Sequence, residues 1–210
     1  MSIIHNTTVT PGKLDLLTDW LPSQPWYTGS ATPVLAKTGG FRLDDPAGEV
    51  GMEFMVVTDE STGQPVSYHV PLTYRAAPFA PAEAGFVGTM EHGVLGKRWA
   101  YDGMHDPVLV TALLALIQGE AEPQAQSVSD APDTSVVGHC GSPVRLVVDG
   151  SLNGSGVRVS GADYQAVLDV VRVLRSEDVA PAQGIGHVTA GWRLPDQTEV
   201  RGCFAMVTDA

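Results

Sequence analysis

Three polar residues that lie close together, Asp102, His105 and Asp106, are the first candidates for chemistry in this chain. Imidazole and carboxylate groups are common metal ligands and proton carriers, so the cluster suggests a metal site or an acid–base pair. A structural role competes with this interpretation, because Asp106 precedes Pro107 and can cap a helix that begins there. Asp102 precedes a glycine in a turn. We therefore expect a structural cluster, with Asp102 and His105 as an alternative polar site.

Two further stretches carry reactive residue types without the arrangement that catalysis needs. His139 and Cys140 are neighbours, and neighbouring residues of a strand point to opposite faces, so we expect no shared proton. The glycine-rich stretch 150–156 lacks the lysine that completes a phosphate-binding loop. No G-x-S-x-G, H-E-x-x-H or paired C-x-x-C motif occurs, so we expect no catalytic residue, metal or cofactor.

Trp20, Trp26 and Tyr27 are the third group of candidates, and they flank the end of a helix expected to begin after Pro11. Clustered aromatic rings can stack on a sugar or a nucleobase, but aromatic residues near a helix end are also common in hydrophobic cores. The exposure of the three rings distinguishes ligand stacking from a core role.

The element that must position Asp102, His105 and Asp106 is a buried helix within Tyr101–Gln118. Its apolar residues recur at helical spacing, and at about 13 residues it is too short to span a bilayer. Upstream of it, hydrophobic runs predict antiparallel strands at 41–43, 50–58, 66–74, 86–90 and 98–101. We therefore expect an α+β fold in which an antiparallel sheet packs on this helix.

Residues 120–135 separate this part from the remainder of the chain. They are rich in proline, serine and acidic residues and show no helical or strand period, which predicts a linker between domains at 1–119 and 136–210. In the second part, the sequence predicts strands at 144–148 and 156–159, a helix at 162–175 capped by Ser160, and strands at 185–194 and 199–207. Its expected order is strand, strand, helix, strand, strand.

The composition narrows the function classes. The net charge is -12 and no basic cluster offsets it, which argues against nucleic-acid and anionic-membrane partners. The N-terminus lacks the features of a signal peptide, so we expect a cytoplasmic protein in which Cys140 and Cys203 are reduced.

Three stretches, Gly39–Phe54, Tyr68–Arg75 and Tyr101–Ile117, resemble the N-terminal cap of the bacterial maltokinases and related aminoglycoside-like sugar kinases. The resemblance covers residues 1–119. It implies a curved antiparallel sheet with helices, joined through an intermediate segment to a two-lobed body that phosphorylates maltose or a similar sugar with ATP. Relatives of this kind are sometimes labelled glucan-branching proteins, but neither the length nor the element pattern of this chain fits such an enzyme.

The second part resembles a degenerate kinase N-lobe in the segments 134–137, 144–150, 162–175 and 204–210. A kinase N-lobe carries a lysine on its third strand that holds the nucleotide phosphates. Val147 or Val148 stands near that place, and no lysine follows Lys97. The chain also ends about where the hinge to the second lobe would begin. We therefore expect that it is not a complete kinase.

These observations lead to three functional hypotheses. The first is a non-catalytic module that acts through protein contacts in α-glucan, maltose or trehalose metabolism. A protein partner or a second copy would cover Phe204 and Val207, whose strand lies under the second lobe in a complete kinase. The second is a carbohydrate- or metabolite-binding module that uses the aromatic group at 20–27. The third is a small enzyme of unrecognised type with Asp102 and His105 at its site.

Overall fold

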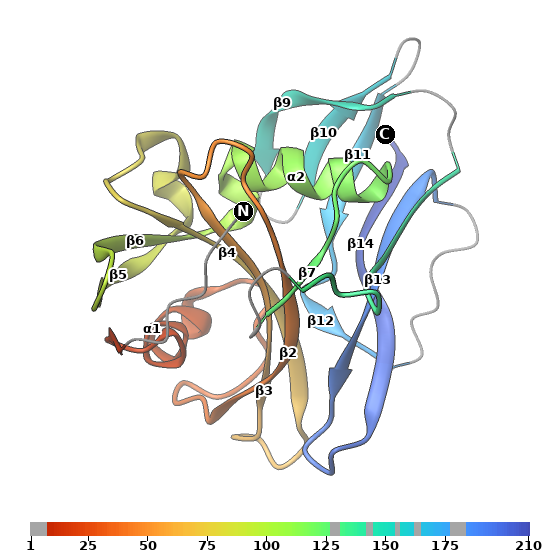
Figure 1. Ribbon diagram of the computed structural model, residues 1–210. Helices are drawn as coiled ribbons and strands as arrows, with labels where there is room; N and C mark the ends of the chain where they lie inside the picture. Colours follow the sequence, from red (N-terminus) through yellow and green to blue (C-terminus); the bar gives the residue numbers. More distant parts are fainter. Residues whose placement is uncertain (1–7, 127–130, 142–144, 154–155, 162–164, 177–183) are drawn as a thin grey trace.

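The computed structural model describes residues 8–126, 131–141, 145–153, 156–161, 165–176 and 184–210. Within these ranges an antiparallel sheet of 14 strands forms most of the fold (Figure 1). The early strands are β1 (Val9–Thr10), β2 (Leu35–Leu43), β3 (Gly51–Asp59), β4 (Val66–Arg75), β5 (Phe86–His92) and β6 (Gly96–Asp102). The later strands are β7 (Gln124–Ala125), β8 (Val137–Cys140), β9 (Val147–Asn153), β10 (Gly156–Ser160), β11 (Gln165–Val170), β12 (Val173–Leu174), β13 (Gly186–Arg193) and β14 (Glu199–Asp209).

In the described part of the chain the helices are short and lie in the first 120 residues. They are α1 (Lys13–Trp20), α2 (Pro107–Ile117) and the 3-10 turns η1 (Leu21–Ser23), η2 (Ala80–Gly85) and η3 (Gly103–His105). The hydrogen-bonded strand order is β1-β5-β6-β4-β3-β2-β13-β14-β11-β10-β9, and β7, β8 and β12 pair beside this path. The antiparallel strands predicted from residue 41 to residue 101 are all present.

The two faces of β3 and β4 are covered by different elements. Phe54 and Val56 face the main core, which they share with α2, whereas Met55 and Val57 face a smaller core that contains Leu17 of α1. Successive residues of a strand point to opposite faces, so the nearly continuous apolar run of β3 serves both cores. The prediction of a sheet packed on a buried helix is confirmed.

Helix α2 begins where the sequence predicts. The Asp106 carboxylate accepts a hydrogen bond from the Val108 amide at 3.0 Å, and Pro107 occupies the first turn. Figure 1 shows α2 lying between the early strands and β9 to β11. Leu109, Leu113 and neighbouring residues are therefore buried on several sides. No helix in the described ranges is long and apolar enough to cross a membrane.

The prediction of a helix at 162–175 is wrong for the residues that the structure describes. Residues 165–170 form β11, which pairs with β14, and residues 173–174 form β12, which pairs with β4. Ala166, Leu168 and Val170 are buried in alternation. The segment is rich in β-branched valine, and the edge of β14 supplies backbone partners that a helix would leave unused. Residues 162–164 lie outside the described ranges, so Ser160 has no described helix to cap. Among its described residues this unit lacks the helix that the kinase N-lobe resemblance implied.

The predicted boundary at 120–135 does not interrupt the sheet. Residues 124–125 form β7 beside β2, β13 pairs with β2, and β12 pairs with β4. The main core also contains residues from both predicted domains, including Phe41 and Phe204. The two parts thus share one sheet and one core.

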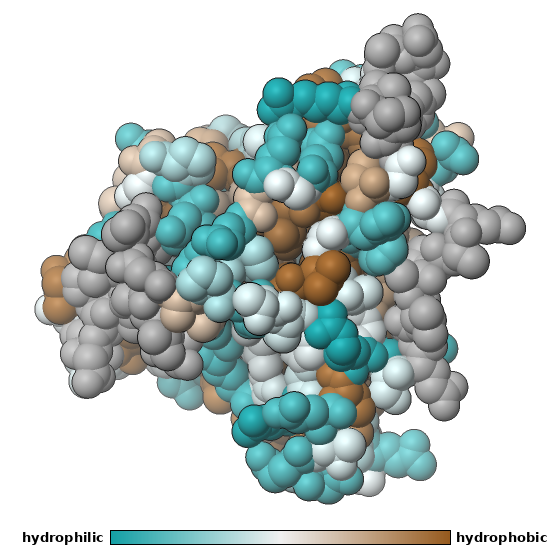
Figure 2. Space-filling view, turned by 45° about the vertical axis from the view of Figure 1, so that its right-hand side comes forward, coloured by the Kyte–Doolittle hydropathy of each residue, from teal (hydrophilic) through white to brown (hydrophobic). Residues whose placement is uncertain are grey.

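Phe204 and Val207 do not form an exposed surface. Both side chains are 0% exposed, because they pack in the main core of the same chain, where the Phe204 ring lies against those of Phe41 and Trp192. The interface expected at Phe204 and Val207 is therefore wrong. On the face in Figure 2, apolar side chains occupy small areas between polar ones.

Candidate functional site

A cleft of about 910 Å³ opens between the β5–β6 hairpin and the neighbouring ends of β3 and β4. Small-molecule sites commonly have volumes of roughly 300–1,000 Å³. The polar and aromatic side chains of its lining are Lys13, Arg42, Glu49, Glu53, Tyr74, Arg75, Phe79, His92, Arg98 and Gln126. They come from α1, β2, β3, β4, the β5–β6 hairpin and the segment after β7, so the tertiary fold assembles the cleft.

Glu53 of β3 is the central polar group of this cleft. Its residue is only 3% exposed, yet its carboxylate has several donors. Oε2 accepts from Lys13 Nζ at 2.5 Å and from the Tyr74 hydroxyl at 2.8 Å. Oε1 accepts from Gln126 Nε2 at 2.8 Å and lies 3.6 Å from Lys37 Nζ. These hydrogen bonds offset the free-energy cost of removing the carboxylate from water, and the carboxylate in turn holds the donors in place.

The same contacts set the protonation of the site. Burial by itself would raise the pKa of the Glu53 carboxyl, but Lys13, Lys37 and the Tyr74 hydroxyl hold the pKa below its usual value. Burial and the adjacent Glu53 raise the pKa of the Tyr74 hydroxyl well above its usual value. Near neutral pH, Glu53 is therefore a carboxylate and Tyr74 a neutral hydroxyl.

Gly40 permits the close approach of Gln126 to Glu53. Its φ of 124° lies in a region that favours glycine, and an added Cβ would lie 2.8 Å from Gln126 Nε2 and 2.2 Å from the Phe54 carbonyl oxygen. A side chain at this position would therefore clash with the Phe54 backbone and displace the Gln126 amide.

We expect Gly40→Ala to lower the free energy of unfolding by about 2–4 kcal/mol, since it adds a backbone clash to an unfavourable φ. Denaturant unfolding measures this change. The matched control is Gly48→Ala, which also has a positive φ, 71°, but has nothing within 4 Å of an added Cβ. Equal losses in the two variants would contradict the proposed clash with Phe54 and Gln126.

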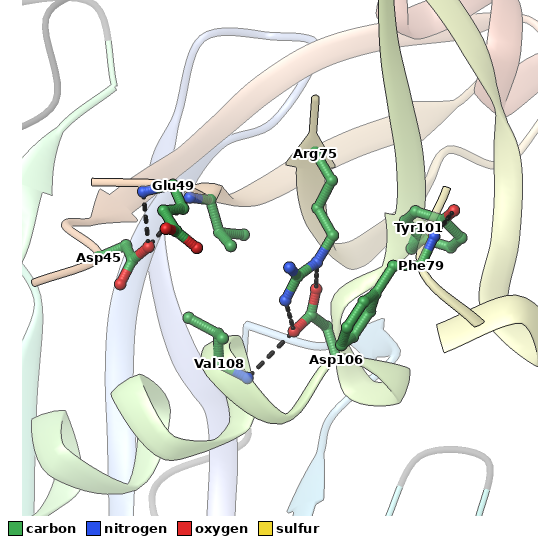
Figure 3. Close-up of polar contacts among 8 residues, drawn as sticks. Asp45, Glu49, Arg75, Phe79, Tyr101, Asp106 and Val108 are labelled. Atoms are coloured by element: carbon green, nitrogen blue, oxygen red, sulfur yellow. Dashed lines mark hydrogen bonds and ion pairs between the residues drawn. The ribbon is translucent and has the colours of Figure 1, made fainter. Parts of the chain in front are cut away.

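Arg75 forms part of the wall of the cleft and pairs with the buried Asp106 at the start of α2 (Figure 3). Arg75 donates to Asp106 through Nε at 2.7 Å and Nη2 at 2.8 Å, and its guanidinium lies 3.7 Å from the centre of the Phe79 ring. The same carboxylate caps α2 through Val108. The wall is therefore rigidly connected to the buried helix.

Residues 20–106 match the family model of the maltokinase N-terminal cap domain. This part of the chain is similar to a maltokinase cap, and we refer to it as the cap-like domain. The match runs from the last residue of α1 through β6 and η3 and ends at the cap of α2. It thus confirms the resemblance to the cap, and it includes most of the lining of the cleft.

The aromatic group of the cap-like domain packs into its smaller core. Trp26 lies 5.9 Å from Trp20 and 6.0 Å from Tyr68 between ring centres, and the Arg172 guanidinium lies over its ring. The Tyr27 hydroxyl donates to Asp59 at 2.6 Å. The three predicted rings, Trp20, Trp26 and Tyr27, are half-buried and already contact one another or the core, and none of them lines the cleft.

Asp102 has a structural role at the end of the cap-like domain. Its residue is 3% exposed, Oδ1 accepts from the Met104 amide at 3.1 Å, and Oδ2 accepts from Arg172 Nη2 at 2.6 Å. His105 is half-buried beside Gly85, where an added Cβ would lie 2.7 Å from the ring. Asp102 and His105 therefore contact different groups, and neither lines the cleft.

Other reactive residue types are dispersed. His139 on β8 stands opposite His187 on β13 with ring centres 5.1 Å apart, and Cys140 follows it on the strand. Within the described ranges, no three His, Cys, Asp or Glu residues form a group that could hold a metal ion.

Glu53 was not singled out from the sequence, although one signal was present. It is the only charged residue among the first eight residues of β3, GMEFMVVT. A lone carboxylate in an apolar strand must be paired or must face a polar site, because its desolvation is costly. Its partners stand at positions 13, 37, 74 and 126, so sequence spacing could not identify them.

Proposed function

We propose that this chain is a non-catalytic cytoplasmic binding module of α-glucan, maltose or trehalose metabolism, and that its ligand site is the cleft around Glu53. The observation that carries this proposal is a cleft of about 910 Å³ in which a buried carboxylate holds Lys13, Tyr74 and Gln126 in fixed positions. The similarity of residues 20–106 to the maltokinase cap supports the choice of metabolism.

The lining suits a small hydroxylated molecule. Hydroxyl groups need both donors and acceptors, and the cleft offers side chains of both kinds, such as Arg98, Gln126 and Glu49. The Tyr74 and Phe79 rings add apolar surface, which carbohydrate and metabolite sites use to pack on the faces of a ring. This site differs from the one expected at Trp20, Trp26 and Tyr27.

The protonation of the site supports a binding role rather than catalysis. General acid–base catalysis works best when the pKa of the catalytic group lies near the working pH. The pKa of Glu53 is lowered and that of Tyr74 is raised, so neither group exchanges a proton readily near neutral pH. Glu53 acts instead as the group that positions the donors around it.

Association with a protein partner or a second copy of the chain stays a prediction. Phe204 and Val207, which first suggested it, are buried in the sheet. A partner would therefore have to use another surface.

We expect saturable binding when the protein is titrated calorimetrically with maltose, trehalose and glucose 1-phosphate, a panel of neutral and charged sugars. At least one sugar should bind. Glu53→Gln should raise its dissociation constant about tenfold or more, since the uncharged amide no longer holds Lys13 and Tyr74 in place. The matched control is Glu199→Gln, which alters an exposed ion pair with Arg193 away from the cleft.

Melting curves of both variants separate lost binding from unfolding. If none of the three sugars binds, or if the two variants behave alike, the cleft is not the ligand site. With Mg-ATP and either maltose or trehalose we expect no ADP formation, and steady ADP release would contradict the non-catalytic role.

A further inference from the structure

The lining of the cleft has more cationic than acidic side chains. Lys13, Arg42, Arg75 and Arg98 line it, together with the acidic Glu49 and Glu53. The whole chain has 12 lysine and arginine residues against 24 acidic ones. The cleft therefore carries a local excess of positive charge on a protein with a net charge of -12. Such a local excess attracts an anion against the field of the remaining surface.

Arg98 differs from Lys13 and Arg75 in its contacts. Lys13 pairs with Glu53 and Arg75 pairs with Asp106, while Arg42 donates through Nε to the Ala125 carbonyl at 3.1 Å. Arg98 donates through Nη2 to the Leu95 carbonyl at 2.9 Å, and no ion pair with a carboxylate is found for it among the described residues.

The Arg98 Nε is enclosed and has no hydrogen-bond partner in the described part of the chain. An enclosed N–H without a partner costs about 1–3 kcal/mol, and more when the group is charged. The hairpin keeps the side chain in place, because Arg98 stands opposite Met90 in the β5–β6 ladder and donates to Leu95 in the connecting turn. The guanidinium is thus held at the cleft, and its Nε donor is not used by any group among the described residues.

We propose that the cleft binds a sugar-sized anion and that Arg98 holds its phosphate or carboxylate group. This inference rests on the proposed binding function and adds the charge class of the ligand. The planar guanidinium matches the two oxygens of either anion in a bidentate contact. Lys13 adds positive charge to the same cleft, and Glu53 and Gln126 provide polar groups for the hydroxyls of the ligand.

Calorimetric titrations with glucose 1-phosphate, glucuronate and glucose test the anion and distinguish phosphate from carboxylate. We expect at least one of the two anions to bind about tenfold more tightly than glucose. Arg98→Gln should remove this advantage of the anion over glucose, while Arg98→Lys should keep part of it, since lysine retains the charge without the bidentate fork. The matched control Arg158→Gln changes an exposed arginine on β10 and should keep the full advantage.

Each of the other outcomes rejects or supports one part of the proposal. Equal affinity for glucose and both anions in the unmodified protein would overturn the anion site and leave the proposed binding function standing. Loss of the anion preference in both the Arg98 and Arg158 variants would show long-range charge attraction without a contact from Arg98. If inorganic phosphate, titrated as a further probe, binds as tightly as glucose 1-phosphate, the anion site stands and the sugar component is wrong. Binding of none of these compounds would reject the anion site, whereas the binding function itself is rejected only if maltose and trehalose also fail to bind.

Discussion

Lowering the pH from 7 to about 5 should destabilise the fold by about 2 kcal/mol through His69 alone, and His69→Leu should remove this loss. His69 is 0% exposed and lies in the main core, where its ring centre is 4.6 Å from that of Phe204 and 6.0 Å from that of Phe54. Neither ring nitrogen has a well-formed hydrogen bond within the described residues.

The cause is a large difference in pKa between the folded and unfolded states. Burial, followed by the nearby Arg172 guanidinium, lowers the pKa of His69 from 6.5 to about 3. Below pH 6.5 the unfolded chain binds a proton that the folded protein takes up only near pH 3. Stability is therefore unaffected above this window and is lost as the pH falls through it, at about 1.4 kcal/mol per pH unit.

Denaturant unfolding at several pH values, for the unmodified protein and His69→Leu, isolates this contribution. Leucine fills the apolar site without a titrating group, so the stability of the unmodified protein relative to His69→Leu should fall by about 2 kcal/mol between pH 7 and pH 5. His139→Leu removes an exposed imidazole and is the control for how the loss of one histidine changes the dependence of stability on pH. Parallel curves for the unmodified protein and His69→Leu would mean that His69 does not cause the acid sensitivity.

Replacing Arg172 with methionine should lower the free energy of unfolding by about 3–5 kcal/mol, because it leaves the buried Asp102 carboxylate without its ion-pair partner. Both side chains are 4% exposed, and Arg172 Nη2 lies 2.6 Å from Asp102 Oδ2. The pair connects the end of β6 with the segment between β11 and β12, and thus the two predicted domains.

A double-mutant cycle with Asp102→Asn measures this coupling. The double variant should recover part of the stability lost in Arg172→Met, since it buries no unpaired charge. Arg175→Met, at an exposed arginine three residues further along, is the matched control and should change stability by less than about 1 kcal/mol. Similar losses in Arg172→Met and Arg175→Met would contradict the ion-pair account.

The same experiment tests whether the two parts unfold together. They share one sheet and one core, so we expect a single transition for fluorescence from all the tryptophans and for circular dichroism. Two separated transitions in the unmodified protein would support the independent domains that the composition of residues 120–135 predicted.

Local patterns in the sequence were sufficient for much of the first half. The Asp106–Pro107 start of α2 and the alternating residues of β3 depend on neighbours a few positions away, so the chain itself encodes them. The resemblance to the maltokinase cap lies in the same region. Residues 165–174 show the limit of such patterns, because their apolar residues fit a helical stripe as well as an alternating strand, and β14 and β4 decide between the two.

The sequence by itself determined the early strands, the capped buried helix, the acidic balance and the similarity to the cap. Only the tertiary structure decided that Glu53 meets Lys13, Tyr74 and Gln126, that Asp102 pairs with Arg172, and that Phe204 is enclosed. These pairings join residues that are 21 to 73 positions apart. The cost of burying an unpaired charge selects such partners, but sheet pairing determines which residues lie within reach of one another.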